Sequence, residues 1–214
     1  MNKNEKFVIT INRELGSGGR TVGEKLAAKL GVPFYDKALV KGLMAKYSLT
    51  VEEIERLKGR SHSWWADFKR VMSIGQDAAN STNYYQVSIG DEPDLLTTDE
   101  MFRAEQEILK GIAAEESCVI AGRSGFYVLK DHPNHMSILI QASMEHRIQR
   151  VMRKQGISHE EAEKIIKKVD KMRENYVNYY TKTSRYDTRN YNLVIDMDGK
   201  TEEEVAEFIY QFIG

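Results

Sequence analysis

The sequence predicts a three-layer α/β/α fold, in which a five-stranded parallel sheet is covered by helices on both faces. Two observations lead to this prediction. Short apolar segments rich in β-branched residues recur along the chain, and the segments between them have helical spacing. Several expected helices also begin with capping residues. The 214 residues suffice for one α/β domain, residues 1–214, with a small insertion.

Five apolar segments are the expected strands: Phe7–Ile11, Val32–Tyr35, Cys118–Ala121, Met136–Ile140 and Leu193–Ile195. Helices between successive strands imply parallel pairing, and ligands of such sheets bind beyond the carboxyl ends of the strands. Capping boxes mark four expected helix starts, namely Thr50 with Glu53, Thr97 with Glu100, Ser158 with Glu161, and Thr201 with Glu204. Ser143 is a further candidate N-cap.

Residues 59–97 interrupt this alternation. The segment is polar, contains both tryptophans, and is too long for a plain connection. We predict a helix around Trp64–Ile74 followed by an irregular excursion. One interpretation is a mobile insertion that covers a substrate and presents aromatic rings to a base. The other is that Trp64, Trp65 and Phe68 anchor the insertion on the core or on a partner subunit.

A glycine-rich turn joins the first strand to the first helix. It reads Gly16, Ser17, Gly18 and Gly19, followed by Arg20 and Thr21. Glycines allow backbone N–H groups to point inward, and a helix N-terminus favours an anion. Thr21 stands where a hydroxyl would meet Mg²⁺. The order of strand, glycines and helix therefore predicts a nucleotide-phosphate site.

The turn departs from the standard phosphate-loop pattern, G-x-x-x-x-G-K-[ST]. The lysine position holds Gly19 or Arg20, depending on the register, and the first glycine is missing. An ordinary flexible Gly/Ser turn is the alternative interpretation. The buried strand before the turn and the helix after it favour phosphate binding.

Four segments carry a resemblance to a known family. These are ITINRELGSGGRTVGEKLAAKLGVPFYDKALV, CVIAGRSGFYVL, VDKMRENYVNYY and YNLVIDMDGKTEEEVAEFI. Together they resemble the cytidylate kinase-like family, relatives of bacterial cytidylate kinase, over most of the chain except residues 59–97. The resemblance implies a P-loop kinase fold with a helical insertion over the acceptor site and a helical lid.

The resemblance also implies roles for individual residues. Gly16, Ser17, Gly18, Gly19, Arg20 and Thr21 match the loop that holds the donor phosphates. Asp36 matches the aspartate that orders the acceptor site or metal, although it could also cap the next helix. Arg123 matches the arginine that grips the acceptor monophosphate, for which a forked guanidinium is suited.

The lid is expected over residues 143–182. Three arginines recur every third residue on one expected helix, and an Asp-x-x-Arg pair follows on the next: Arg147, Arg150, Arg153, Asp170 and Arg173. The resemblance implies that Asp170 and Arg173 contact nucleotide. Arginines on a closing lid supply positive charge and exclude water during phosphoryl transfer. A solvated, charged helix pair is the alternative.

The resulting prediction is ATP- and Mg²⁺-dependent phosphoryl transfer to a nucleoside monophosphate such as CMP, or to a related small acceptor. Arg20, Arg150, Arg153 and Arg173 are the candidate catalytic residues, and Thr21 is the candidate metal ligand. Two alternatives stay open because the loop lysine is missing and the base site has no recognisable motif. One is a module of the same fold that senses a nucleotide without turnover. The other is a kinase for a non-nucleotide acceptor, such as a shikimate-like alcohol.

The composition and charge of the chain limit the classes of binding partner to expect. The net charge of −1 predicts no general attraction to nucleic acid or membrane. No apolar run approaches the ~18 residues of a membrane span, and the N-terminal segment lacks the apolar core of a signal peptide. Cys118, the single cysteine, is compatible with a reducing cytoplasm. We therefore expect a cytoplasmic protein whose partner is a small nucleotide, and homo-oligomerisation is left open.

Overall fold

The computed structural model describes residues 1–37, 40, 50–60 and 99–214. The chain divides into two compact units, of which the first comprises Met1–Asp36 with Ser117–Gly214 and the second Lys37–Glu116. Most of the segment at 59–97, including the helix expected around Trp64–Ile74, lies outside the described residues. The Thr97 capping box lies outside them too.

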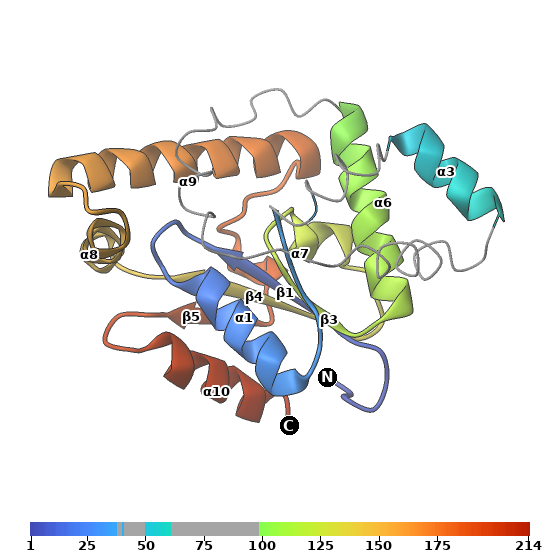
Figure 1. Cartoon of the computed structure of the whole chain (residues 1–214), viewed down its shortest axis with the longest axis horizontal. Coiled ribbons are helices and arrows are strands. Elements are labelled where there is room, and N and C mark those ends of the chain that lie inside the picture. Colours follow the sequence, from blue (N-terminus) through green and yellow to red (C-terminus); the bar gives the residue numbers. More distant parts are fainter. Residues whose placement is uncertain (38–39, 41–49, 61–98) are drawn as a thin grey trace. The chain divides into compact units, whose positions relative to one another are not determined.

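The first unit is built on a five-stranded, fully parallel sheet of order β2-β3-β1-β4-β5 (Figure 1). The strands are β1 (Val8–Arg13), β2 (Phe34–Asp36), β3 (Cys118–Ala121), β4 (His135–Gln141) and β5 (Leu193–Asp196). Each overlaps its predicted segment, so the five strands and their parallel arrangement are confirmed. Because β1 lies between β3 and β4, the loop after β1 lies between the carboxyl ends of these neighbours.

Helices cover the sheet and extend from its carboxyl edge. In chain order they are α1 (Gly19–Leu30), α7 (Gly125–Val128), α8 (Met144–Gln155), α9 (His159–Thr181), a 3₁₀ turn (Thr188–Asn190) and α10 (Glu202–Phe212). Helices α1 and α10 lie side by side on one face (Figure 1). There they bury β-strand side chains such as Ile9, Ile11 and Ile138 against Leu26 and Ile209. Gly125 of α7 approaches Thr10 on the opposite face of β1.

The helix starts confirm the capping predictions within the described residues. Ser158 and Thr201 form complete capping boxes with Glu161 and Glu204, and Ser143 accepts a hydrogen bond from the N–H of His146. At α3 (Val51–Arg60), the N–H of Glu53 donates to the Thr50 hydroxyl. Local sequence therefore sets where these helices begin.

The second unit contains α3 and α6 (Asp99–Glu115). Its described core includes Ile54 of α3 and Ile108, Leu109 and Ile112 of α6, all fully buried. Lys58 forms an ion pair with Glu107 between the two helices. The second unit begins before residue 59 and ends after residue 97, so it is larger than the predicted insertion.

Candidate functional site

The glycine turn connects β1 to α1 as a tight loop. Gly16 and Gly18 both have φ of +85°, a left-handed conformation that favours glycine. Ser17 is buried; its hydroxyl donates to the Glu14 carbonyl at 3.0 Å and accepts from the N–H of Gly19 at 3.4 Å. The N-cap of α1 is Gly18, which has no side chain to bond the first turn, and that turn contains no acidic residue. The positive end of α1 is therefore suited to an external anion.

Helices α8 and α9 support the outer side of this loop. A Cβ on Gly16 would lie 2.7 Å from the backbone oxygen of Arg147, so α8 approaches the loop as closely as glycine permits. The N–H of Leu15 donates to Asp170 Oδ1 at 3.0 Å, and Arg147 forms an ion pair with the same carboxylate. Leu15 also packs on the small apolar core shared by α8 and α9, which includes Ile148. The predicted lid helices thus hold the loop in place.

Glu14 is the acidic residue of the loop. Its Oε2 accepts from the N–H of Ala142 at 3.2 Å and lies 3.7 Å from Nε of Arg147. Burial raises the pKa of Glu14 above its ordinary value, although the charge of Arg147 opposes the shift.

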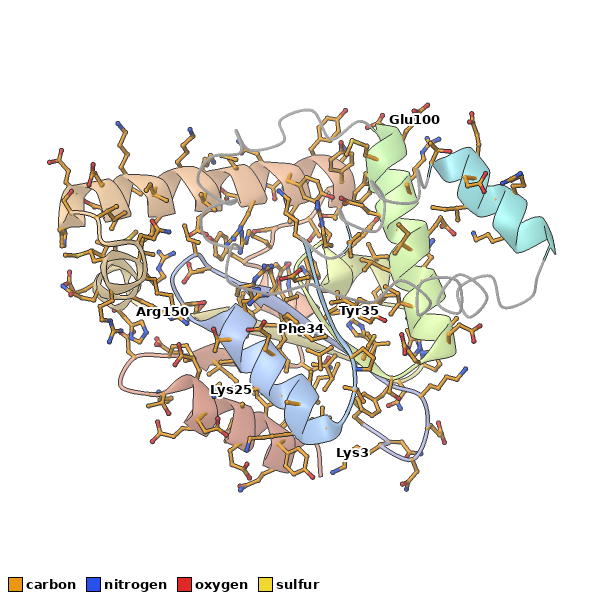
Figure 2. The ribbon with its side chains drawn as sticks, in the orientation of Figure 1. Lys3, Lys25, Phe34, Tyr35, Glu100 and Arg150 are labelled. Carbon is orange, nitrogen blue, oxygen red and sulfur yellow. The ribbon has the colours of Figure 1, made fainter. Side chains whose placement is uncertain are left out.

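Thr21 lies in the first turn of α1 and contacts a lid arginine. Arg150, labelled in Figure 2, donates from Nη2 to Thr21 Oγ1 at 3.2 Å and to Glu202 Oε1 of α10 at 2.5 Å. Burial of Glu202 acts to raise its pKa, but a bond from its own N–H and the charge of Arg150 outweigh burial and lower it. Arg150 itself is buried. The predicted metal-binding hydroxyl and a predicted catalytic arginine therefore lie in direct contact.

Arg20 and Asp36, predicted for the donor and the acceptor site respectively, form one ion pair. Arg20 Nε lies 2.8 Å from Asp36 Oδ2, and its Nη1 lies 2.6 Å from Glu24 Oε1. The guanidinium carbon of Arg20 lies 5.7 Å from the centre of the Phe34 ring. Arg20 thus pairs with one carboxylate on its own helix, Glu24, and with one at the end of β2, Asp36.

Arg123 follows β3 within a turn of unusual backbone conformation. Gly122, Arg123 and Ser124 have φ of 85°, 53° and 53°. Left-handed conformations at two successive non-glycine residues are costly and are often retained at functional sites. The Arg123 guanidinium lies over the ring of Tyr176 on α9, 5.5 Å from its centre.

Arg173 of α9 reaches the end of β1, where its Nη1 donates to the backbone oxygen of Arg13 at 3.4 Å. It also lies 3.7 Å from Asp170. The remaining predicted lid arginine, Arg153, is exposed on α8. The structure thus brings Thr21, Arg150, Asp170 and Arg173 around the loop, and all four are buried or partly buried, whereas Arg153 is exposed.

The family model of the cytidylate kinase-like family matches residues 8–199. The chain belongs to this family. Membership extends over both units, including residues 59–97, which the sequence resemblance had left out.

A crystal structure of an uncharacterized protein from Eubacterium ventriosum is similar, with 25% identity, a TM-score of 0.66, and coverage of 97% of this chain and 98% of that chain. Shikimate kinase from Bacteroides thetaiotaomicron shares the fold, with 14% identity, a TM-score of 0.51, and coverage of 97% and 98%. No curated protein gives a significant match. The family and the parallel sheet together establish a three-layer kinase fold.

Two arginines at this site were missed in the sequence. Arg13 ends β1 and is buried; Arg185 follows α9, is 1% exposed, and donates from Nη2 to the Arg13 carbonyl at 2.6 Å. Arg13 occupies the first-glycine position of the phosphate-loop pattern when Gly19 is taken as the lysine position, and that coincidence could have identified it. No sequence pattern identifies Arg185, because it lies 172 residues from Arg13 along the chain and the two meet only in the folded protein.

The described residues contain neither a candidate membrane span nor a cluster of metal ligands. No helix in that part of the chain is long and apolar enough to cross a membrane. Nor do three or more His, Cys, Asp or Glu side chains gather there as a ready-made metal site.

Proposed function

We propose that this protein transfers the γ-phosphoryl group of ATP to a nucleoside monophosphate such as CMP, or to a related small acceptor, with Mg²⁺. One observation carries the proposal. The start of α1 is a side-chain-free glycine turn between β1 and the helix, beside a threonine hydroxyl that a buried arginine contacts. This arrangement suits phosphate oxygens, and family membership makes a nucleotide the expected donor.

The loop residues fit the donor and its metal. The N–H groups of Gly16–Thr21 would hold the ATP phosphates, and Thr21 offers a hard oxygen ligand of the kind that Mg²⁺ prefers. Bound Mg²⁺ would neutralise charge on the phosphate oxygens. Arg150 and Arg173 add positive charge at the same loop, since both reach it from the lid helices.

The acceptor assignment rests on the residues that follow β3 and β2. Arg123 would bind the acceptor phosphate, because a guanidinium at the end of a central strand can meet two phosphate oxygens. Asp36 would orient the acceptor through its ion pair with Arg20. The preference for CMP rests on the family alone.

A second candidate is a nucleotide sensor without turnover. It is favoured by the position of Arg20, because the ion pairs with Asp36 and Glu24 offset the charge that would replace the missing loop lysine. The two candidates differ in one observable, the formation of ADP.

The deciding experiment is a screen of nucleoside monophosphates with ATP and Mg²⁺, read as ADP formed. The matched control omits the acceptor, so that ATP hydrolysis is subtracted. A kinase forms ADP only with a preferred monophosphate. Tight ATP binding without transfer to any monophosphate would exclude the nucleoside monophosphate kinase and leave the sensor or a kinase for a non-nucleotide acceptor.

A further inference from the structure

At positions 13 and 19 the residues are exchanged relative to the phosphate-loop pattern, which has a glycine at the first and a basic residue at the second. With Gly18 as the second glycine of G-x-x-x-x-G-K, the first glycine falls at position 13 and the lysine at position 19. Here an arginine stands at the glycine position and a glycine at the lysine position. The basic side chain is therefore displaced along the chain by six residues in the pattern.

The two positions face each other in space. A Cβ on Gly19 would lie 2.6 Å from Cβ of Arg13, 3.2 Å from its Cγ and 3.2 Å from Cβ of Ile140. No side chain can begin at position 19 while the stem of Arg13 is in place. The stem of Arg13 thus fills the room in which a loop lysine would start.

The guanidinium of Arg13 extends from this point towards β3. A Cβ on Gly122 would lie 2.1 Å from Nη1 of Arg13, so the guanidinium rests directly on the backbone of Gly122. Gly122 precedes Arg123, the proposed ligand of the acceptor phosphate. The side chain therefore runs from the lysine position of the donor loop to the turn of the acceptor arginine, which is the region that a transferring phosphoryl group must cross.

The surroundings of Arg13 are rich in positive charge. Arg173 and Arg185 both donate to its backbone oxygen, at 3.4 and 2.6 Å. Nε and Nη1 of Arg185 are buried without a hydrogen-bond partner. Two carboxylates lie nearby, Asp170 and Glu14, and both are beside Arg147. Arg13, Arg147, Arg173 and Arg185 thus outnumber the two acids at this strand end, and a bound anion would balance the excess positive charge.

We propose that Arg13 takes the place of the missing loop lysine and binds phosphate oxygens of the nucleotide held by the Gly16–Thr21 loop. This inference rests on the proposed function. A guanidinium offers five N–H donors, so Arg13 can keep its contacts within the protein and still bind a phosphate.

The test measures binding and needs no turnover. The ligands are ATP and inorganic tripolyphosphate, each titrated calorimetrically into the wild type, Arg13→Gln, Arg13→Gly, Gly19→Lys and the double variant Arg13→Gly with Gly19→Lys. Arg13→Gln keeps most of the stem and removes the charge. The double variant restores the pattern at positions 13, 18 and 19. Arg189→Gln, which alters an arginine whose side chain is 88% exposed, is the control.

We expect Arg13→Gln to weaken both ligands by about 10- to 100-fold, the range for loss of a charge-assisted hydrogen bond. Gly19→Lys alone should lower the melting temperature and gain no affinity, because its side chain meets the stem of Arg13. The affinity of the double variant for both ligands should exceed that of Arg13→Gly by about tenfold or more. Gly19→Lys would then raise affinity only when Arg13 is absent, and such non-additivity shows that the two positions share one site. The control should bind as the wild type does.

The inference is overturned if folded Arg13→Gln binds both ligands as the wild type does, or if the folded double variant binds no better than Arg13→Gly. Should Arg13→Gly fail to fold, Arg13→Gln decides alone. Transfer to CMP by the wild type with unchanged ATP binding in Arg13→Gln would remove the inference and keep the proposed function. If Arg13→Gln loses ATP binding but the wild type transfers no phosphoryl group, the inference is kept and the proposed function is removed. A wild type that binds neither ligand overturns both.

Discussion

Arg20 Nε lies 2.8 Å from Asp36 Oδ2, and this ion pair joins the first turn of α1 to the end of β2. The side chain of Asp36 is only 5% exposed, so removal of its partner would leave a buried carboxylate. From its position in the sequence, Arg20 is a candidate substitute for the loop lysine, one residue late when Gly19 is taken as the lysine position. Its contacts instead favour a role in orienting Asp36.

The first prediction follows from this pair. Arg20→Ala should lower the free energy of unfolding by about 2 kcal/mol and should weaken ATP binding by less than about threefold. Urea denaturation and calorimetric titration measure the two effects, and Asp36→Asn should reproduce the loss of stability. If kcat/KM for ATP falls instead by ~10²-fold in Arg20→Ala, the guanidinium acts on the phosphates.

The second prediction separates the acceptor arginine from a lid arginine. Arg123→Ala should mainly raise KM for the acceptor, because its phosphate is bound in the ground state and the transition state alike. Arg150→Ala should mainly lower kcat, because charge beside Thr21 acts on the transferring group. Steady-state kinetics with the monophosphate found in the screen measures both. Equal effects on KM and kcat in the two variants would refute this division.

The third prediction concerns the close approach of α8 to the loop. Gly16 and Gly199 have φ of +85° and +70°, but a Cβ on Gly16 would lie 2.7 Å from the Arg147 oxygen, whereas a Cβ on Gly199 would meet nothing within 4 Å. Gly199→Ala should cost about 1–2 kcal/mol, the backbone strain alone. Gly16→Ala should cost more, because a backbone atom must also move. Urea denaturation of both variants checks the difference, and equal losses would mean that the contact yields easily.

The fourth prediction concerns Asp170, which bonds the N–H of Leu15 and pairs with the buried Arg147. Asp170→Asn should lower the free energy of unfolding by about 3 kcal/mol, since it removes the carboxylate that pairs directly with the buried Arg147 and leaves only Glu14, 3.7 Å from Nε, as counter-charge. The control is Glu163→Gln, which breaks an exposed ion pair with Lys167 and should lower the free energy of unfolding far less. Comparable losses in the two variants would show that Arg147 finds another partner.

The fifth prediction concerns stability in acid. His135 Nε2 lies 2.7 Å from Thr10 Oγ1, and burial, aided by the charge of His132, lowers the pKa of His135 from 6.5 to about 4. Between these values the unfolded chain binds a proton that the native protein does not. Stability should therefore be complete above pH 6.5 and fall as the pH approaches 4, by up to about 3 kcal/mol.

The control for this prediction removes the group. His135→Gln should show a shallower loss of stability between pH 6.5 and 4, whereas replacement of the exposed His159 by Gln should leave the slope unchanged. Urea denaturation at pH 7, 6, 5 and 4 measures the slopes. Identical slopes in wild type and His135→Gln would exclude His135 as the cause.

The sequence by itself determined the strands, the helix starts and the position of the glycine loop. These features depend on neighbours in the chain: an apolar run such as Cys118–Ala121 is buried as a strand, and Ser158 caps a helix through a residue three positions away. Local patterns identify local structure because the interacting groups are close in sequence.

Only the tertiary structure decided which cations meet at the loop. It placed Arg13 against Gly19 and Gly122, brought Arg185 to the carbonyl of Arg13, and turned Arg20 towards Asp36. A long arginine side chain can reach in several directions from one backbone position, and its choice depends on charges and space supplied by distant segments. Spacing along the chain does not predict which distant segments lie near an arginine. The direction of each guanidinium is therefore set only once the strands are assembled in the order β2-β3-β1-β4-β5.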